Sequence, residues 1–256
     1  MVSLLMNTTW VILHKGLLPS RKPLKIFVKE RIVYPSYMFE FDVIITLLIE
    51  ENLQLVIVVD DEDRENEGDL IMAASMATPE AMAFIVKHGT GIVCVSMKAE
   101  DLERLELPLM VTQKENEEKI CTAFTVSVDA EHGTTTGVSA CDRATTVLAL
   151  ASKDSKPEDF NRPGHIFPLK YREGGVPKRA GHTEASVDLA VLAGLEPVAV
   201  LCEIVDNDGS MARLPKLREF AQAEKLKIIS IADIIRYRRK RERLVELAAA
   251  ALIPTM

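Results

Sequence analysis

The sequence is short of cysteine, of basic charge and of long apolar runs, and each shortage excludes a class of protein. Its scattered cysteines form no Cys-x-x-Cys pair, which disfavours zinc and redox sites and indicates reduced thiols in an intracellular compartment. The formal net charge is −7, which argues against nucleic acid as the main partner, because phosphate backbones attract basic surfaces. The four cysteines are Cys94, Cys121, Cys141 and Cys202.

Two further absences concern membranes and nucleotides. No apolar run reaches the ~18 residues that cross a bilayer, so we expect no membrane association. No Gly-x-x-x-x-Gly-Lys-Ser/Thr pattern occurs, so a nucleoside triphosphate is not indicated.

The first forty residues carry six Lys/Arg against two Glu. This composition fits a transit peptide or an unstructured segment about equally well, because serine is sparse and Glu30 interrupts the basic stretch.

Hydrophobic periodicity predicts alternating strands and helices from about Val43 to Tyr237. The chain has 256 residues, 48% of them hydrophobic, enough to bury a substantial core. No repeat or flexible linker divides this region, so it is most simply one α/β-type domain. We predict strands at Leu55–Val59, Gly91–Met97, Phe124–Asp129, Val198–Ile204 and Lys227–Ile231. We predict helices at Pro79–Lys87, Asp101–Leu107, Ser139–Ala151, Thr183–Ala193 and Pro215–Lys225 and from Ala232 onward, with an irregular Pro/Gly-rich stretch at Lys153–Lys178.

The acidic run Asp60–Asp69 follows directly on the apolar strand Leu55–Val59. Seven of its ten residues are carboxylates and one is Arg64. Carboxylates gathered at a strand end repel one another unless a cation joins them, and a hard divalent ion such as magnesium prefers such oxygen ligands. Gly68 permits a backbone conformation that turns several side chains inward. The alternative is a solubilising loop.

A second group of residues, Arg179–Glu184, lies at the predicted start of a helix with Thr183 as its N-cap. A helix N-terminus favours anions, Arg179 adds a bidentate donor, and Gly181 allows close backbone approach, so the group suits a phosphate. His182 lies beside it and has the chemistry of a metal ligand. An ordinary capped helix with an exposed histidine is the alternative.

Two single residues are further candidates for proton transfer. His165 lies in the Pro/Gly-rich stretch on a restrained backbone, although a lone loop histidine is more often structural. Glu203 lies inside an apolar strand, where a carboxylate must be paired, bound to metal or raised in pKa; an exposed strand face explains it equally well. Cys94, inside another apolar strand, is best interpreted as a packed, inert thiol.

Six blocks of the sequence, in their order along the chain, are VVDDEDRENEGDL (58–70), HGTGIVCVSM (88–97), TTTGVSACDRATT (134–146), NRPGHIFPL (161–169), RAGHTEASVDL (179–189) and LCEIVDNDGSMAR (201–213). Together these blocks closely resemble 3,4-dihydroxy-2-butanone 4-phosphate synthase of riboflavin biosynthesis. The resemblance covers about Val56–Tyr237, and the basic end of the chain resembles the plant bifunctional protein without its GTP cyclohydrolase II domain.

The resemblance implies a lyase that converts D-ribulose 5-phosphate to 3,4-dihydroxy-2-butanone 4-phosphate and formate. It implies an α+β fold, a single domain with a mixed β-sheet flanked by helices, and a homodimer with active sites at the subunit interface. Glu65 and His182 match positions that bind magnesium, with manganese as an alternative ion. His165, Glu203 and Asp69 match catalytic positions. The substrate-binding positions are matched by Arg64, Glu65, Asp69, Arg179, Ala180, Gly181, His182, Thr183 and Glu203.

The resemblance also divides the chain into three parts. Residues 1–42 form a divergent N-terminal segment, residues 43–237 the synthase domain, and residues 238–256 a basic helix or connector. Similarity to the plant enzyme implies a plastid location; without a targeting segment we expect a cytoplasmic one. The alternatives are a metal-dependent sugar-phosphate isomerase or aldolase, and a non-catalytic sugar-phosphate-binding paralogue that partners a bifunctional relative.

Overall fold

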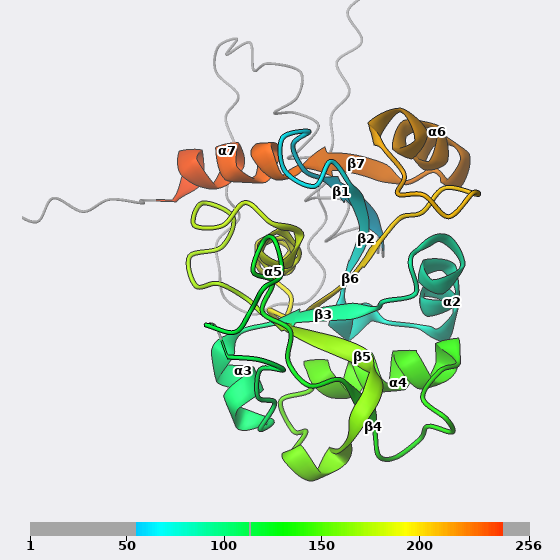
Figure 1. The fold of residues 1–256 in the computed structure, drawn as a ribbon, viewed down its shortest axis with the longest axis vertical. Coiled ribbons are helices and arrows are strands. Elements are labelled where there is room, and N and C mark those ends of the chain that lie inside the picture. The colour runs from blue at the N-terminus through cyan, green and yellow to red at the C-terminus, as the bar shows by residue number, and fades with distance from the viewer. Residues whose placement is uncertain (1–54, 113, 243–256) are drawn as a thin grey trace, which may run out of the picture. The chain divides into compact units, whose positions relative to one another are not determined.

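The computed structural model describes residues 55–112 and 114–242, and its central feature is a mixed sheet (Figure 1). The strand order is β4-β5-β3-β6-β2-β1-β7. β1 pairs with β7, and β3 with β5, in parallel, while the other neighbours are antiparallel. The strands are β1 (Val56–Val59), β2 (Gly68–Ala73), β3 (Cys94–Met97), β4 (Val128–Ala130), β5 (Phe160–Lys170), β6 (Ala199–Glu203) and β7 (Lys227–Ser230).

Helices cover both faces of the sheet, which confirms the α+β class. Figure 1 shows α5 on one side of β2 and β6, with α2 and α6 on the other. The α-helices are α2 (Pro79–His88), α3 (Ala99–Arg104), α4 (Ala140–Ala151), α5 (His182–Leu192), α6 (Leu214–Glu224) and α7 (Ile231–Arg241), and two short 3-10 turns are η1 (Ala74–Met76) and η2 (Pro157–Asp159).

Two apolar layers hold the helices to the sheet. One layer joins alternate residues of the central strands, such as Ile57 and Leu70, to α2, α4 and α6. The other joins the opposite strand faces, such as Val58 and Ile71, to α5 and α7. All four residues of β1 are buried, as the continuous apolar run predicts for a strand covered on both faces. A sheet covered in this way leaves the strand ends as the places where polar side chains gather.

The Pro/Gly-rich stretch Lys153–Lys178 is not irregular throughout, so that prediction was wrong. It contains the longest strand of the described chain, β5, with eleven residues. The sequence signal failed because proline lacks only the N–H donor and can still accept hydrogen bonds in a sheet. Pro168 pairs with Val95, and its carbonyl accepts from the Thr125 amide and hydroxyl at 3.0 and 2.9 Å.

The start of α5 also differs from the prediction. Gly181, not Thr183, is the N-cap, and no side chain caps this end. Thr183 is buried inside the first turn. The predicted stop is confirmed, because Gly194 has φ +73° and donates to Val191, while the Leu195 amide donates to Ala190. These paired bonds are the glycine-terminated C-cap that helices commonly use.

Other element bounds shift by a few residues. The predicted strand Gly91–Met97 begins only at Cys94, and Phe124–Asp129 forms only isolated bridges before β4 starts at Val128. The predicted helix Asp101–Leu107 is observed as α3, at Ala99–Arg104. Ile231, predicted as the last residue of a strand, is the first residue of α7. The predicted segment of residues 1–42, the first residues of the 43–237 domain and most of 238–256 lie outside the described residues. Within the described part, no helix is both long and apolar enough to traverse a bilayer.

Candidate active site

The acidic run is a folded turn between β1 and β2, and Asp60 organises it. Its side chain is 1% exposed and accepts from the Glu65 amide at 3.1 Å, the Glu67 amide at 2.9 Å and the Arg64 guanidinium at 2.8 Å. Arg64 also pairs with the Glu65 carboxylate. Because the carboxylate of Asp60 satisfies these donors, the run holds one shape and directs Glu65 inward. The solubilising-loop interpretation does not fit this geometry.

The turn within this run is made by Asn66 and not by Gly68. Asn66 has φ +56°, a left-handed conformation that asparagine tolerates, and the Arg213 guanidinium donates to the carbonyls of Glu65 and Asn66. Gly68 is the first residue of β2, and a Cβ there would lie 2.5 Å from Leu217 Cδ1. The glycine therefore lies in close contact with a side chain of α6 and does not make the turn, which corrects the role expected from the sequence.

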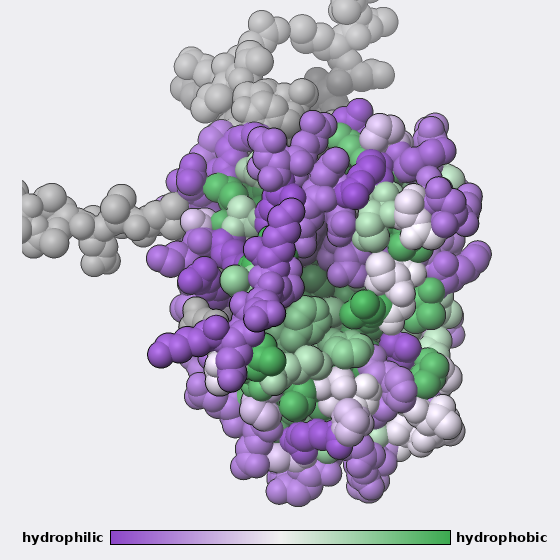
Figure 2. Space-filling view, viewed as in Figure 1, coloured by the Kyte–Doolittle hydropathy of each residue, from purple (hydrophilic) through white to green (hydrophobic). Residues whose placement is uncertain are grey.

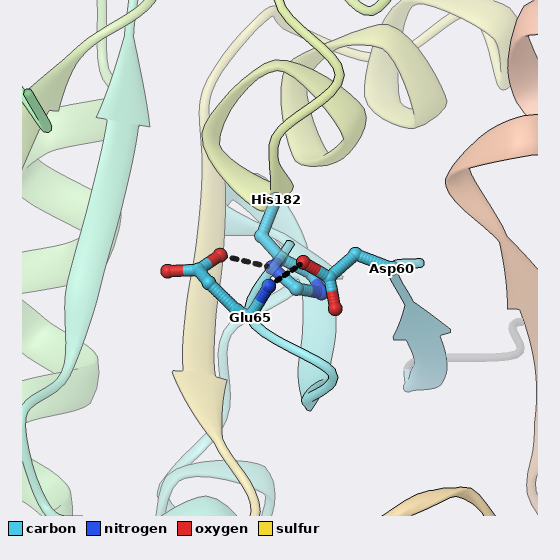
Figure 3. Close-up of side chains that lie close together, drawn as sticks. All are labelled: Asp60, Glu65 and His182. Atoms are coloured by element: carbon cyan, nitrogen blue, oxygen red, sulfur yellow. Dashed lines mark hydrogen bonds and ion pairs between the residues drawn. The ribbon is translucent and has the colours of Figure 1, made fainter. Parts of the chain in front are cut away.

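The end of the acidic run meets the start of α5. Asp69 pairs across the sheet with Glu203 of β6, and His182 is the first residue of α5. His182 Nδ1 lies 3.5 Å from Glu65 Oε2, and its Nε2 lies 3.8 Å from Asp69 Oδ1. Figure 3 shows Asp60, Glu65 and His182 directed toward one another. Residues from distant parts of the chain thus form one polar cluster at a strand end.

Burial and mutual attraction set the charges of this cluster. Burial raises the pKa of Asp69 to about 7, against the attraction of His182. Burial opposes the charged form of His182, but the carboxylates of Asp69 and Glu65 outweigh it and raise the pKa of His182 to about 9. Burial also opposes the charge of Glu65, while His182 and Arg64 bring its pKa below the ordinary value. Asp69 is therefore suited to exchanging a proton near neutral pH.

The cluster has the donor set of a divalent-cation site. Ligand atoms from Asp60, Glu65 and His182 all lie within 4.8 Å of one another. Asp60 uses both its oxygens in the turn described above, so Glu65 and His182 are the better ligands. His182 Nε2 and Asp69 Oδ1 are buried without a hydrogen-bond partner among the described residues, a costly state that a bound group would relieve. Carboxylate oxygens suit magnesium or manganese, and neutral imidazole is a common ligand of divalent metals.

An anion cradle adjoins this cluster at the N-terminus of α5. The first N–H groups of a helix point outward and favour negative charge. A Cβ at Gly181 would lie 2.9 Å from the Arg64 guanidinium and closer still to that of Arg179. Two arginines therefore converge over the start of this helix, where the glycine leaves them room. Ala180 is exposed, and it is not among the residues that line the cavity between the cluster and the cradle.

A cavity of about 170 Å³ joins the cation cluster to the cradle. On the face in Figure 2, hydrophobic side chains gather centrally and hydrophilic ones surround them. Sequence reasoning missed Glu118 and Thr122 of the segment before β4, which also line the cavity; no motif marked them. The predicted residues that line it are Arg64, Glu65, Asp69, Arg179, His182, Thr183 and Glu203.

Thr90 is a further residue that the sequence did not single out. Its hydroxyl donates to Glu203 Oε2 at 2.8 Å, and its backbone N–H donates to the Glu203 carbonyl at 2.9 Å. Glu203 is thus the paired strand carboxylate that its position requires.

Cys94 is buried and burial raises the pKa of its thiol, in agreement with a packed, inert side chain.

His165 does not lie with the other predicted residues. It is exposed on β5 and is absent from the lining of the cavity. Its Nδ1 lies 2.7 Å from Asp129 Oδ2, and its backbone N–H donates to Asp129 Oδ1 at 2.9 Å. Two bonds to one carboxylate fix the ring and leave its other edge open to solvent.

Fold and site together define the chain as an α+β protein in which a cluster with the donor set of a divalent-cation site lies beside two arginines at a helix N-terminus. The sequence pattern of the 3,4-dihydroxy-2-butanone 4-phosphate synthase family matches residues 50–237. The chain therefore belongs to this family.

Relatives and solved structures agree with that membership. The chain is 84% identical, over 79% of its length and 43% of the relative's, to the monofunctional riboflavin biosynthesis protein RIBA 2, chloroplastic, of Arabidopsis thaliana. It is 56% identical to 3,4-dihydroxy-2-butanone 4-phosphate synthase of Neisseria meningitidis, over 75% of this chain and 53% of that one. A crystal structure of a synthase with two magnesium ions superposes with a TM-score of 0.75 at 45% identity, covering 78% of this chain and 97% of that one. The chain spans less than half the length of the first relative.

Proposed function

We propose that the chain is a magnesium-dependent lyase that converts D-ribulose 5-phosphate to 3,4-dihydroxy-2-butanone 4-phosphate and formate in riboflavin biosynthesis. The observation that carries this proposal is one cavity that joins Glu65 and His182 to Arg64 and Arg179. The first pair suits a divalent cation and the second a phosphate, which are the two groups that a metal-dependent reaction of a sugar phosphate requires. Membership of the synthase family supports the particular reaction.

The residues of the cavity have distinct roles in this proposal. Arg179, Arg64 and the first N–H groups of α5 bind the phosphate and fix the position of the sugar. Glu65 and His182 hold the cation, which when bound supplies positive charge that stabilises an oxyanion. Asp69 and Glu203 face the sugar from adjacent strands. There they take protons from its C–H and O–H groups and return them. Manganese takes the same donors and is expected to substitute for magnesium.

His165 enters the proposal through a second copy of the chain. We propose a homodimer in which His165 of each subunit completes the cavity of the other, because its fixed ring faces solvent outside its own cavity. A mixed-dimer experiment tests this arrangement. Dimers that combine His165→Ala with Glu65→Gln contain one intact site of two, so a random mixture recovers about a quarter of wild-type activity. A histidine that acts within its own chain gives no recovery.

The direct test of the reaction is formate release from ribulose 5-phosphate with and without magnesium. We expect Glu65→Gln and His182→Ala to lower magnesium-dependent turnover by about a hundredfold or more, since each removes one side of the cation site. Glu62→Gln is the matched control, because it removes an exposed carboxylate of the same run. Isomerisation of the sugar without formate would instead support an isomerase, and undiminished turnover in either variant would contradict the metal assignment.

The remaining expectations concern location and extent. Several chloroplastic plant proteins are similar to this chain, which supports a plastid location and can be checked by imaging a fluorescent fusion. We propose residues 43–237 as the catalytic domain and residues 238–256 as a basic helix or connector. The retained cation and cradle residues favour an enzyme over a non-catalytic paralogue.

A further inference from the structure

The loop Arg172–Gly181 connects β5 to α5 and carries Arg179 to the anion cradle. A surface loop of ten residues is ordinarily among the more mobile parts of a protein. Here it packs against two carboxylates one turn apart on α5, Glu184 and Asp188. Their exposures are 1% and 5%. Buried carboxylates on one helix face must be matched by donors, and the loop provides most of them.

Glu184 holds both ends of the loop. Its Oε2 accepts from the Arg179 guanidinium at 2.7 Å, and its Oε1 accepts from the Arg172 amide at 3.1 Å. Arg179 uses its second terminal nitrogen on the Ile120 carbonyl and the Thr122 hydroxyl, each at 3.3 Å. Both terminal nitrogens of the Arg179 guanidinium are therefore held by hydrogen bonds. Glu184 sets the direction from which this guanidinium enters the cavity.

Asp188 holds the middle of the loop. Its Oδ2 accepts from the Val176 amide at 2.9 Å and from the Arg238 guanidinium at 2.6 Å. Its Oδ1 accepts from the Tyr171 hydroxyl at 3.0 Å. Arg238 comes from α7 and also donates to the Gly174 carbonyl at 3.2 Å. One buried carboxylate thus joins the end of β5, the loop and the last described helix.

Gly175 shows how closely the loop lies on this ion pair. Its φ is +67°, and a Cβ at this position would lie within 3.0 Å of the Arg238 guanidinium and of both oxygens of Asp188. A side chain at residue 175 would separate the loop from the ion pair. The backbone therefore rests directly on the pair, and any change in the pair moves the loop.

We propose that Glu184 and Asp188, with Arg238, are positioning residues that hold Arg179 and the loop in the conformation that receives the substrate phosphate. This inference rests on the proposed function, in which Arg179 binds that phosphate. The physical reason is preorganisation: a loop that is already ordered loses less conformational entropy on binding. Loss of an anchor therefore weakens phosphate binding more than it slows the bound reaction.

The test compares isosteric variants in steady-state kinetics and in competition by inorganic phosphate. We expect Glu184→Gln and Asp188→Asn to raise the KM for ribulose 5-phosphate and the inhibition constant of inorganic phosphate by about tenfold, with kcat changed less. Arg238→Met raises both constants, and Arg238→Lys restores them in part because it keeps the charge. Arg218→Met, at an exposed arginine of α6, is the matched control and changes neither constant.

Separate results distinguish failure of this inference from failure of the proposed function. If Arg179→Met leaves phosphate inhibition unchanged, the cradle itself is wrong, and the positioning role is wrong with it. If Arg179→Met weakens inhibition while Glu184→Gln and Asp188→Asn do not, the positioning role is refuted and the cradle stands. Should Asp188→Asn fail to fold, Tyr171→Phe removes one bond to the same carboxylate; an unchanged KM there also refutes the proposal.

Discussion

Gly164 offers a sharp test of how the chain holds His165. The residue lies in β5 beside β4, and a Cβ built on it would fall within 3.0 Å of the Val128 carbonyl carbon and oxygen and of the Asp129 amide nitrogen. These are backbone atoms, so no side chain can rotate away to make room. Gly164→Ala must therefore push β4 and β5 apart, by about 1 Å or more at this point.

The cost follows from the hydrogen bonds that this separation breaks. The Gly164 amide donates to Ser127 Oγ at 3.2 Å, and the His165 amide donates to Asp129 Oδ1 at 2.9 Å. An added ångström takes both beyond hydrogen-bond distance. Two lost bonds at about 1 kcal/mol each, plus the strain of an overpacked strand pair, give a loss of about 3 kcal/mol in the free energy of unfolding.

Thermal and urea unfolding measure this loss, with Gly194→Ala as the control. Gly194 has φ +73° but nothing within 4 Å of its Cβ position, so alanine there costs only the left-handed backbone, about 1 kcal/mol. We expect the Tm to fall by about 10 °C for Gly164→Ala and about 3 °C for the control. Formate release should fall with the first variant only, because His165 is displaced. Equal losses of stability in the two variants would refute the steric reasoning.

Three further predictions test separate features. Thr90→Val removes the hydroxyl that orients Glu203 and should lower kcat about tenfold in the formate assay, while Thr90→Ser keeps it; equal rates would contradict the orienting role. Leu217→Ala, at a fully buried position, should lower the free energy of unfolding in urea by about 2–5 kcal/mol. A loss under about 1 kcal/mol would show that neighbouring side chains move to fill the space left by Leu217. Burial, with Lys87, lowers the pKa of His88, so this group binds fewer protons in the folded chain than in the unfolded one, and its own contribution to stability should fall as pH drops through 6.5. The free energy of unfolding of the wild type relative to His88→Gln should therefore fall between pH 7.5 and 5.5, and a difference that does not depend on pH would count against it.

The sequence predicted those parts of the fold that depend on local signals. The run Leu55–Val59 and the cap at Thr78 belong to segments whose pattern agrees with the final environment, and both are confirmed. Ser139 accepts from the Asp142 amide as its spacing indicates. Such features span only a few residues, so their physics is contained in the sequence nearby.

Strand β5 and the start of α5 show where local signals fail. Proline and glycine indicate a loop when read alone, but pairing with β3 and β4 makes Phe160–Lys170 a strand. Thr183 has the side chain of an N-cap, yet the N-cap is Gly181, two residues earlier, because His182 and Thr183 are buried against the sheet. In both cases long-range contacts outweigh the propensity of a single residue.

The sequence by itself brought forward the residues that we propose for the chemistry. Carboxylates after an apolar strand and an Arg-x-Gly-His pattern before a helix have few other uses in combination, and Glu65, Asp69, Arg179 and His182 do meet in one cavity. The resemblance to the synthase family singled out Arg64 and Glu65 within the acidic run, and both line that cavity. Residue type and local order, together with the family resemblance, were sufficient for this much.

Only the tertiary structure decided how these residues act on one another. The pairing of β2 with β6 places Asp69 beside Glu203, and the docking of α5 buries His182 between two carboxylates. Burial and these neighbours raise the pKa of Asp69 to about 7, and the same packing sets the anchors Glu184 and Asp188 beneath the cradle loop. Charges and distances of this kind depend on segments remote in sequence, because an electrostatic environment is a property of the packed molecule and not of any one stretch of chain.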